Sequence, residues 1–179
     1  MLPVMPSHPI PLCVTALVIV AASTDLTCRR IPNRLLAVGL AGALVAQCVL
    51  LGLWAGALAW LTGAATGFAL LMPLYLMRGM AAGDVKLMLT IGAWVGPGLA
   101  AWIVLATFVA GGAGALAVVL WRGRARQLFV NVRYLLARAA LRQQGMAAEM
   151  PAQVASVGAL PYGVAIAAGT LGMLFAAAV

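Results

Sequence analysis

Six long apolar runs constrain the fold of this chain more than any other feature. An α-helix of roughly 20 apolar residues crosses the hydrocarbon core of a bilayer, which is about 30 Å thick. The tripeptide Gly96-Pro97-Gly98 separates the fourth run from the fifth. We therefore expect an all-α, polytopic membrane protein: a bundle of six transmembrane helices in a single domain over residues 1–179. The predicted spans are 10–26, 35–51, 56–77, 80–96, 99–120 and 159–179.

Composition supports a membrane protein and excludes several soluble classes. Apolar residues make up 65% and charged residues 8% of the chain, whereas soluble domains are about half apolar and a quarter charged. A water-soluble enzyme, a disordered chain and a nucleic-acid-binding domain are therefore excluded. The net charge of +8 lies at and between the apolar runs, where basic residues orient a chain in the bilayer. The expected partner is the lipid bilayer, and no nucleic acid.

The distribution of basic residues predicts the orientation of the chain. All eleven Lys and Arg residues lie in or beside the first, third and fifth loops between the predicted spans. Loops rich in Lys and Arg stay in the cytoplasm, so we expect both termini on the opposite side. The first 24 residues contain no Lys or Arg, which favours a retained first span over a cleavable signal peptide.

The longest polar stretch, 122–150, is expected to be a cytoplasmic basic loop. Apolar residues recur in it at helical spacing, with Arg126 and Arg133 on the opposite side. It is either an interfacial helix on the cytoplasmic leaflet or a solvated loop.

Two pairs of glycines have the small-xxx-small spacing of closely packed membrane helices. The pairs are Gly52/Gly56 and Gly63/Gly67. They indicate either close helix contacts or the ordinary glycine content of a membrane sequence.

The polar side chains exclude most hydrolytic chemistries. The single histidine, His8, precedes the first span, and no HExxH motif is present, so a zinc peptidase lacks its ligands. The few serines have neither a nearby base nor a nucleophile-elbow sequence. The three cysteines have no CxxC spacing and are expected to be buried, without disulfides: they are Cys13, Cys28 and Cys48. We expect no metal and no organic cofactor.

Asp25 and Asp84 are the only aspartates in the chain, and both lie at the cytoplasmic ends of predicted spans. A charged side chain at the centre of a membrane helix costs about 2.5–3.5 kcal/mol, which makes such residues functional candidates. Two carboxyl groups that meet share a proton and provide an acid and a base together, as in aspartic proteases. The alternatives are structural: Asp84 as a helix N-cap, and Asp25 as a solvated residue paired with Arg29.

Three segments resemble characteristic segments of type IV prepilin peptidases. Residues 25–33, DLTCRRIPN, resemble the D-x5-I-P-N segment of that family, and residues 83–87, GDVKL, resemble its second aspartate segment. Residues 160–169, LPYGVAIAAG, resemble its last helix. The subgroup that the chain most resembles is the short peptidase of tight-adherence (Flp) pilus systems.

The resemblance implies a membrane-embedded aspartic endopeptidase of the GxGD type, with catalytic Asp25 and Asp84 and no cofactor. Such an enzyme removes the leader of prepilins or pseudopilins at the cytoplasmic face of the bacterial inner membrane, for pilus assembly. Both termini would then be periplasmic. Ala81 departs from the G-x-G-D pattern, and alanine disfavours the positive φ that glycine allows. The loop residues that would support the aspartates are Ile31, Pro32, Asn33, Gly83 and Lys86.

Two other functions stay open on the residues alone. A small proton-coupled transporter would also use intramembrane carboxylates, as proton relays. However, the two aspartates lie in unlike segments, and no internal repeat is evident. A non-catalytic assembly protein of a pilus or secretion machine would use both aspartates only structurally.

Overall fold

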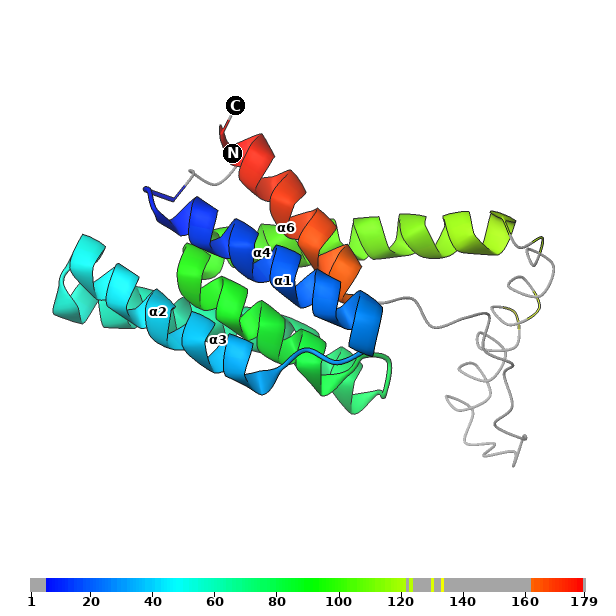
Figure 1. Ribbon diagram of the computed structural model, residues 1–179, viewed down its shortest axis with the longest axis horizontal. Helices are drawn as coiled ribbons and strands as arrows, with labels where there is room; N and C mark the ends of the chain where they lie inside the picture. The colour runs from blue at the N-terminus through cyan, green and yellow to red at the C-terminus, as the bar shows by residue number, and fades with distance from the viewer. Residues whose placement is uncertain (1–5, 122, 124–129, 131–132, 134–161, 179) are drawn as a thin grey trace, which may run out of the picture. The chain divides into compact units, whose positions relative to one another are not determined.

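The computed structural model describes residues 6–121, 123, 130, 133 and 162–178. These residues form α1 (Ile10–Cys28), α2 (Asn33–Leu51), α3 (Leu53–Leu76), α4 (Ala82–Trp121) and α6 (Tyr162–Ala178) (Figure 1). No strand occurs in the described part of the chain, which confirms the all-α prediction there. The chain divides into two units, Met1–Gly112 with Pro161–Val179 and, separately, Ala113–Leu160. The first unit contains both aspartates.

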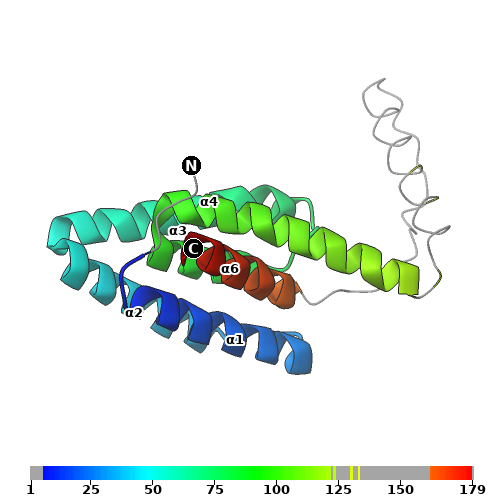
Figure 2. The ribbon, with the colours of Figure 1, turned by 90° about the horizontal axis from the view of Figure 1, so that it is seen from above.

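The helices of the first unit pack in pairs. α2 packs on α3 and α1 packs on α6, and α1 and α6 lie side by side in both ribbon views (Figures 1 and 2). Buried side chains from all five helices form the core, and the fully buried ones include Val14, Ala43, Leu71, Ile91 and Ile166. Lipid tails are as apolar as these side chains, so close packing and hydrogen bonds hold such a core together in a membrane.

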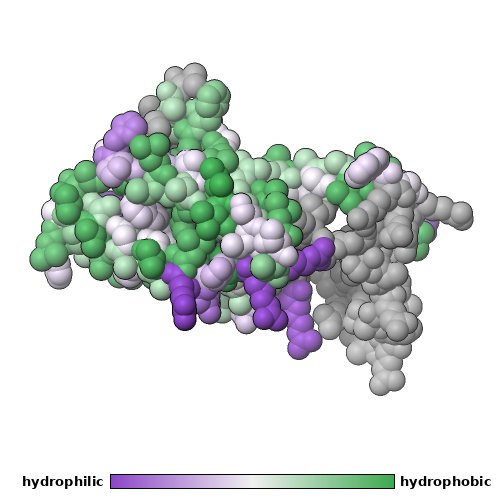
Figure 3. Space-filling model, viewed as in Figure 1, coloured by the Kyte–Doolittle hydropathy of each residue, from purple (hydrophilic) through white to green (hydrophobic). Residues whose placement is uncertain are grey.

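Four of the described helices, α1 to α4, are long and apolar enough to cross a membrane. α6 is apolar but shorter, with 17 residues. Apolar side chains cover much of the visible surface (Figure 3), and Val49, Leu53 and Trp54 are 78%, 78% and 82% exposed. Apolar surface on this scale is favourable in lipid and unfavourable in water. The helices therefore indicate a multi-pass membrane protein.

Gly96 divides α4 into two helical segments that fold back on each other. Its backbone is not helical, with φ 79° and ψ 172°. A Cβ atom built on Gly92 would lie 3.5 Å from Cβ of Ala100, whereas residues eight positions apart in a straight helix are about 12 Å apart. The predicted boundary between the fourth and fifth spans is therefore a chain reversal. That both segments cross the bilayer, giving six spans, stays a prediction.

Gln47 stabilises the end of the first α4 segment. Because Pro97 has no N–H, the Ala93 carbonyl lacks its usual donor four residues later. The Gln47 side chain is 4% exposed and reaches this break from α2. Its Nε2 donates to the Trp94 carbonyl at 2.7 Å and to the Ala93 carbonyl at 3.4 Å. A buried amide thus satisfies carbonyls that the reversal deprives of helical partners.

Glycines allow the backbones of α3 and α4 to approach closely. A Cβ atom on Gly63 would overlap the carbonyl of Gly92, and one on Gly67 would overlap another backbone carbonyl of α4. The Gly63/Gly67 pair is therefore a close helix contact. Gly56 similarly faces the backbone of α2, but Gly52 has open space around it and φ 85°. Gly52 forms the joint between α2 and α3.

Two sequence predictions fall wholly or partly on residues outside the described ranges. The basic loop 122–150 is described only at Gly123, Val130 and Arg133, so its two alternatives stay predictions. The last span, predicted from residue 159, is described from Tyr162, where α6 begins.

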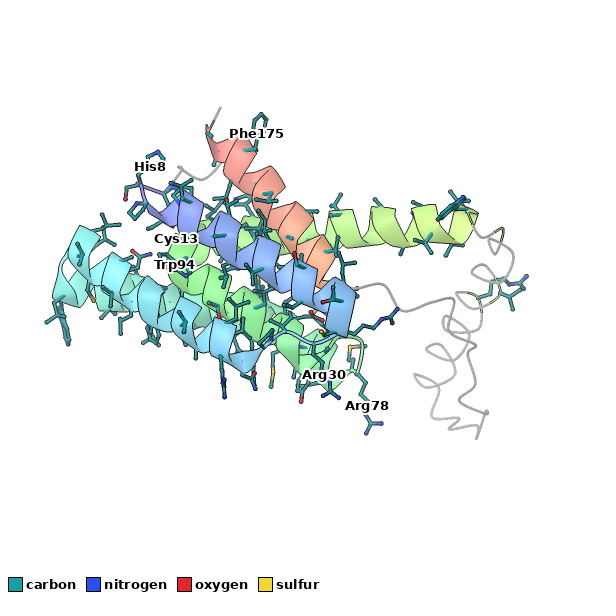
Figure 4. The ribbon with its side chains drawn as sticks, in the orientation of Figure 1. His8, Cys13, Arg30, Arg78, Trp94 and Phe175 are labelled. Atoms are coloured by element: carbon teal, nitrogen blue, oxygen red, sulfur yellow. The ribbon has the colours of Figure 1, made fainter. Side chains whose placement is uncertain are left out.

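Five basic residues lie at one end of the first unit. They belong to the α1–α2 loop, the α3–α4 loop and the starts of α2 and α4, and together they define the basic end: Arg29, Arg30, Arg34, Arg78 and Lys86. Hydrophilic side chains gather along one edge of this unit in Figure 3. Figure 4 shows Arg30 and Arg78 at this end and His8 at the other. The first and third predicted loops thus share one end of the bundle.

Candidate active site

Asp25 lies one turn before the end of α1, with its side chain half-buried. α1 ends at Cys28, because Arg29 adopts the left-handed conformation with φ 50°. The Arg29 N–H donates to the Asp25 carbonyl at 3.0 Å, so these two residues contact each other through backbone atoms. The Asp25 carboxylate accepts a hydrogen bond from the backbone of Gly163, with 2.9 Å between Gly163 N and Asp25 Oδ2.

Asp84 lies in the first turn of α4, at the same end of the bundle. Its side chain is 6% exposed. α4 begins at Ala82, so Asp84 lies inside the helix, and the alternative that it is the N-cap is excluded. Its N–H donates to the Ala81 carbonyl at 3.1 Å. The Asp25 carboxylate is near enough for its charge to act on the Asp84 carboxyl group. The end of α1 and the start of α4 thus place both aspartates in the same part of the bundle.

The two motif segments that contain the aspartates contact each other. The Ile31 side chain faces Gly83, where a Cβ atom would lie 3.7 Å from Ile31 Cβ. Lys86 Nζ donates to Asn33 Oδ1 at 3.3 Å. Pro32, with φ −64° and ψ 127°, leads the chain into α2. The five loop residues singled out in the sequence therefore belong to two segments that meet.

The backbone at Ala81 has a conformation that alanine adopts without strain. Its side chain is exposed, and its φ is not positive. The left-handed residue of this loop is Arg78, with φ 58°. Gly83 has no positive φ either. The turn before Asp84 therefore does not depend on glycine conformations at residues 81 and 83.

Gly163 is the site residue that the sequence reasoning missed. It is buried in the first turn of α6, and its amide touches Asp25. A signal for it exists, because residues 160–163, LPYG, open the third segment that resembles the family. This segment does not indicate what Gly163 does chemically, because a glycine contributes only backbone atoms to a site.

Histidine and cysteine side chains do not extend this site. His8 is exposed at the opposite end of α1 (Figure 4). Cys13, Cys28 and Cys48 are free, and Cys28 is exposed while the other two are half-buried. The prediction that the cysteines are buried is therefore wrong, because Cys28 ends α1 at the bundle surface. Among the described residues, no three His, Cys, Asp or Glu side chains form a group that could hold a metal ion.

The fold and the site define the class of the protein: it is a multi-pass helical membrane protein with two aspartates at the same end of its bundle. Residues 12–116 match the type IV leader peptidase family. Because this match covers more than half of the 179 residues, the chain belongs to that family. No curated protein and no solved structure gives a significant match.

Family membership supports a general role as a prepilin leader peptidase, which is a hydrolase. It favours a peptidase over the transporter and the assembly protein that the residues alone leave open. The matched residues contain both aspartates and the five loop residues, whereas α6, with Gly163, follows them.

Proposed function

We propose that the protein is a membrane-embedded aspartic endopeptidase that removes the leader peptide of prepilins, with Asp25 and Asp84 as its catalytic pair. One observation carries the proposal: the two aspartates of the chain lie within electrostatic range of each other at one end of the bundle. Both lie within the residues that match the leader peptidase family. Two carboxyl groups in such proximity favour sharing one proton over ionising together.

In the proposed reaction, a water molecule attacks the scissile carbonyl carbon and gives a proton to the ionised carboxylate. The protonated carboxyl group gives its proton to the carbonyl oxygen. These two steps produce a tetrahedral intermediate at the carbonyl carbon. The leaving nitrogen then takes a proton from the pair and the C–N bond breaks. As the new carboxyl group forms, one hydroxyl of the intermediate returns its proton to the pair. The pair begins and ends the cycle with one shared proton, and no cofactor takes part.

The different exposure of the Asp25 and Asp84 side chains supports a pair in which one carboxyl group is protonated and the other is ionised. Asp84 is 6% exposed, and a buried, poorly solvated carboxyl group resists a second negative charge nearby. Asp25 is half-buried, which leaves part of its carboxylate accessible to water. A reaction that consumes water at a membrane protein requires such access.

We extend the proposal to prepilins of the Flp type, cleaved at the cytoplasmic face of the bacterial inner membrane. The resemblance of the three motif segments supports the substrate class. The position of the aspartates at the basic end supports the cytoplasmic face, since loops rich in Lys and Arg stay in the cytoplasm.

Purified protein in proteoliposomes, mixed with an Flp-type prepilin, tests the proposal. Wild-type protein is expected to release the leader, as detected by mass spectrometry. Asp25→Asn and Asp84→Asn are each expected to reduce cleavage below about 1% of the wild-type rate. Glu149→Gln changes the one other acidic side chain of the sequence and serves as the matched control. Normal cleavage by either aspartate variant would show that the pair is not catalytic.

A further inference from the structure

We propose that the backbone N–H of Gly163, in the first turn of α6, positions the Asp25 carboxylate for reaction. The inference rests on the proposed function of Asp25. It adds to the active site a helix that follows the family-matched residues 12–116. The residue acts through Asp25, so it is a positioning residue.

The hydrogen bond from Gly163 fixes one of the two oxygens of the Asp25 carboxylate. Gly163 N lies 2.9 Å from Asp25 Oδ2, within the range of a strong N–H···O bond. Amides in the first turn of a helix have no partner within the helix. The Gly163 amide is buried, so it needs an acceptor from outside α6, and Asp25 Oδ2 is that acceptor. Among the described residues Oδ1 accepts no hydrogen bond, so this part of the structure leaves it available for a proton or for water.

The backbone of α6 at Gly163 lies so close to Asp25 that no side chain fits between them. A Cβ atom at this position would lie 2.8 Å from Asp25 Oδ2, 2.9 Å from its Cβ and 3.1 Å from its Cγ. Any side chain here would displace the carboxyl group or separate α6 from α1. Glycine is thus required by the approach of the two helices and not by its own backbone angles, since its φ is not positive.

The packing of α6 makes the contact rigid. α6 packs along α1, and Ile166, one turn after Gly163, is fully buried in the core. A fixed donor on a fixed helix restricts Asp25 more than solvent would. Misplacing a reacting group by about 1 Å can lower a rate by about 100-fold, so a shift of Asp25 is expected to reduce turnover strongly.

Three Gly→Ala variants of α6 separate this role from general packing. Gly163→Ala adds a methyl group against Asp25. Gly169→Ala adds one that would lie 2.6 Å from the backbone N of Thr107, away from Asp25, and Gly172→Ala adds one with no atom within 4 Å. Cleavage kinetics are measured on full-length protein in proteoliposomes, together with the melting temperature and the folded fraction of each variant.

We expect kcat of folded Gly163→Ala to fall about 100-fold with KM within about threefold of wild type, because Asp25 moves while substrate binding stays. Gly169→Ala should lower the melting temperature but keep the kcat of its folded fraction, and Gly172→Ala should change neither. Wild-type kcat in Gly163→Ala, or an equal loss in Gly169→Ala, overturns the proposal. Cleavage by wild type and its loss in Asp25→Asn would still support the proposed function in either case.

Hydrogen exchange tests the contact even where Gly163→Ala does not fold. In Asp25→Ala the Gly163 amide loses its acceptor, so its exchange rate is expected to rise about tenfold, which corresponds to the loss of one hydrogen bond. Asp84→Ala is the matched control and should leave this rate unchanged. Equal protection of Gly163 in wild type and in Asp25→Ala would show that the amide has no functional bond to Asp25.

Discussion

Lys86 Nζ donates a hydrogen bond to Asn33 Oδ1 at 3.3 Å and thereby joins the start of α4 to the first residue of α2. Both residues are exposed, and both belong to segments next to an aspartate. The bond links the start of α2, which follows Asp25 in the chain, to the helix that carries Asp84. We infer that it holds the two motif segments in register.

Removal of either partner of this bond should lower activity moderately. We expect Lys86→Met and Asn33→Ala each to reduce kcat/KM by about 3–10-fold, the effect of one modest hydrogen bond. The double variant should be no worse than the single ones, because the same interaction is lost. Arg34→Ala, at an exposed neighbour in α2, is the control. Fully additive losses would show that Lys86 and Asn33 act independently.

Gly83→Ala should be tolerated, in contrast to Gly163→Ala. The added methyl group would lie in ordinary contact with Ile31, at 3.7 Å from its Cβ, and the backbone is not left-handed. We expect cleavage rates within about threefold of wild type, as for most substitutions without a clash. The restoring change Ala81→Gly should also have little effect. A loss of more than about tenfold in Gly83→Ala would show that substrate approaches this backbone closely.

Gln47→Leu should destabilise the fold without changing the chemistry. The variant leaves the Trp94 and Ala93 carbonyls without a donor at the chain reversal. We expect the free energy of unfolding to fall by about 1–3 kcal/mol, measured by denaturation in detergent micelles. Val45→Leu, on the exposed face of the same helix, controls for a change of volume. Unchanged stability would mean that water replaces the Gln47 amide.

Gly63→Ala should separate α3 from α4. Its Cβ atom would overlap the backbone carbonyl of Gly92, which cannot move independently of its helix. We expect a loss of about 1–3 kcal/mol or more in the same unfolding assay. Gly112→Ala places the same methyl group where no atom lies within 4 Å and should be neutral. Equal stability of the two variants would contradict the close contact.

Native Cys28 provides a test of orientation, because it is exposed and ends α1 beside Arg29. In a Cys13→Ala/Cys48→Ala background, a membrane-impermeant maleimide should label Cys28 in inverted vesicles and not in spheroplasts. Adding Gly98→Cys at the exposed chain reversal of α4 should create a second site labelled only from the outside. Labelling of both cysteines from one side would contradict two crossings by α4, and labelling of Cys28 from outside would contradict a cytoplasmic site.

The sequence predicts the helices well, because a membrane span must be both apolar and long. The predicted runs 35–51 and 56–77 differ from α2 and α3 by at most three residues at each end. The break at Gly96 is predictable too, since proline lacks the N–H that a continuous helix needs. The gathering of basic residues at one end follows from their alternation between loops.

Contacts between distant helices are not visible in the sequence. Gln47 is one polar residue in an apolar run, and nothing in its neighbourhood indicates that it bonds to α4 across the bundle. Gly163 contributes only an amide to Asp25, so composition and spacing carry no sign of that bond. Both roles depend on which helices pack together, and apolar runs specify length far better than they specify neighbours.

The bond between Asp25 and Gly163 also has a consequence for biosynthesis. The two residues are 138 positions apart, and at about 5–20 residues per second the ribosome needs roughly 7–28 s to make that interval. During this time the nascent chain already contains Asp25, and later also Asp84. It does not yet contain the Gly163 amide that orients Asp25. If Gly163 orients Asp25 as proposed, a nascent chain should cleave substrate slowly until α6 has been made and has packed on α1.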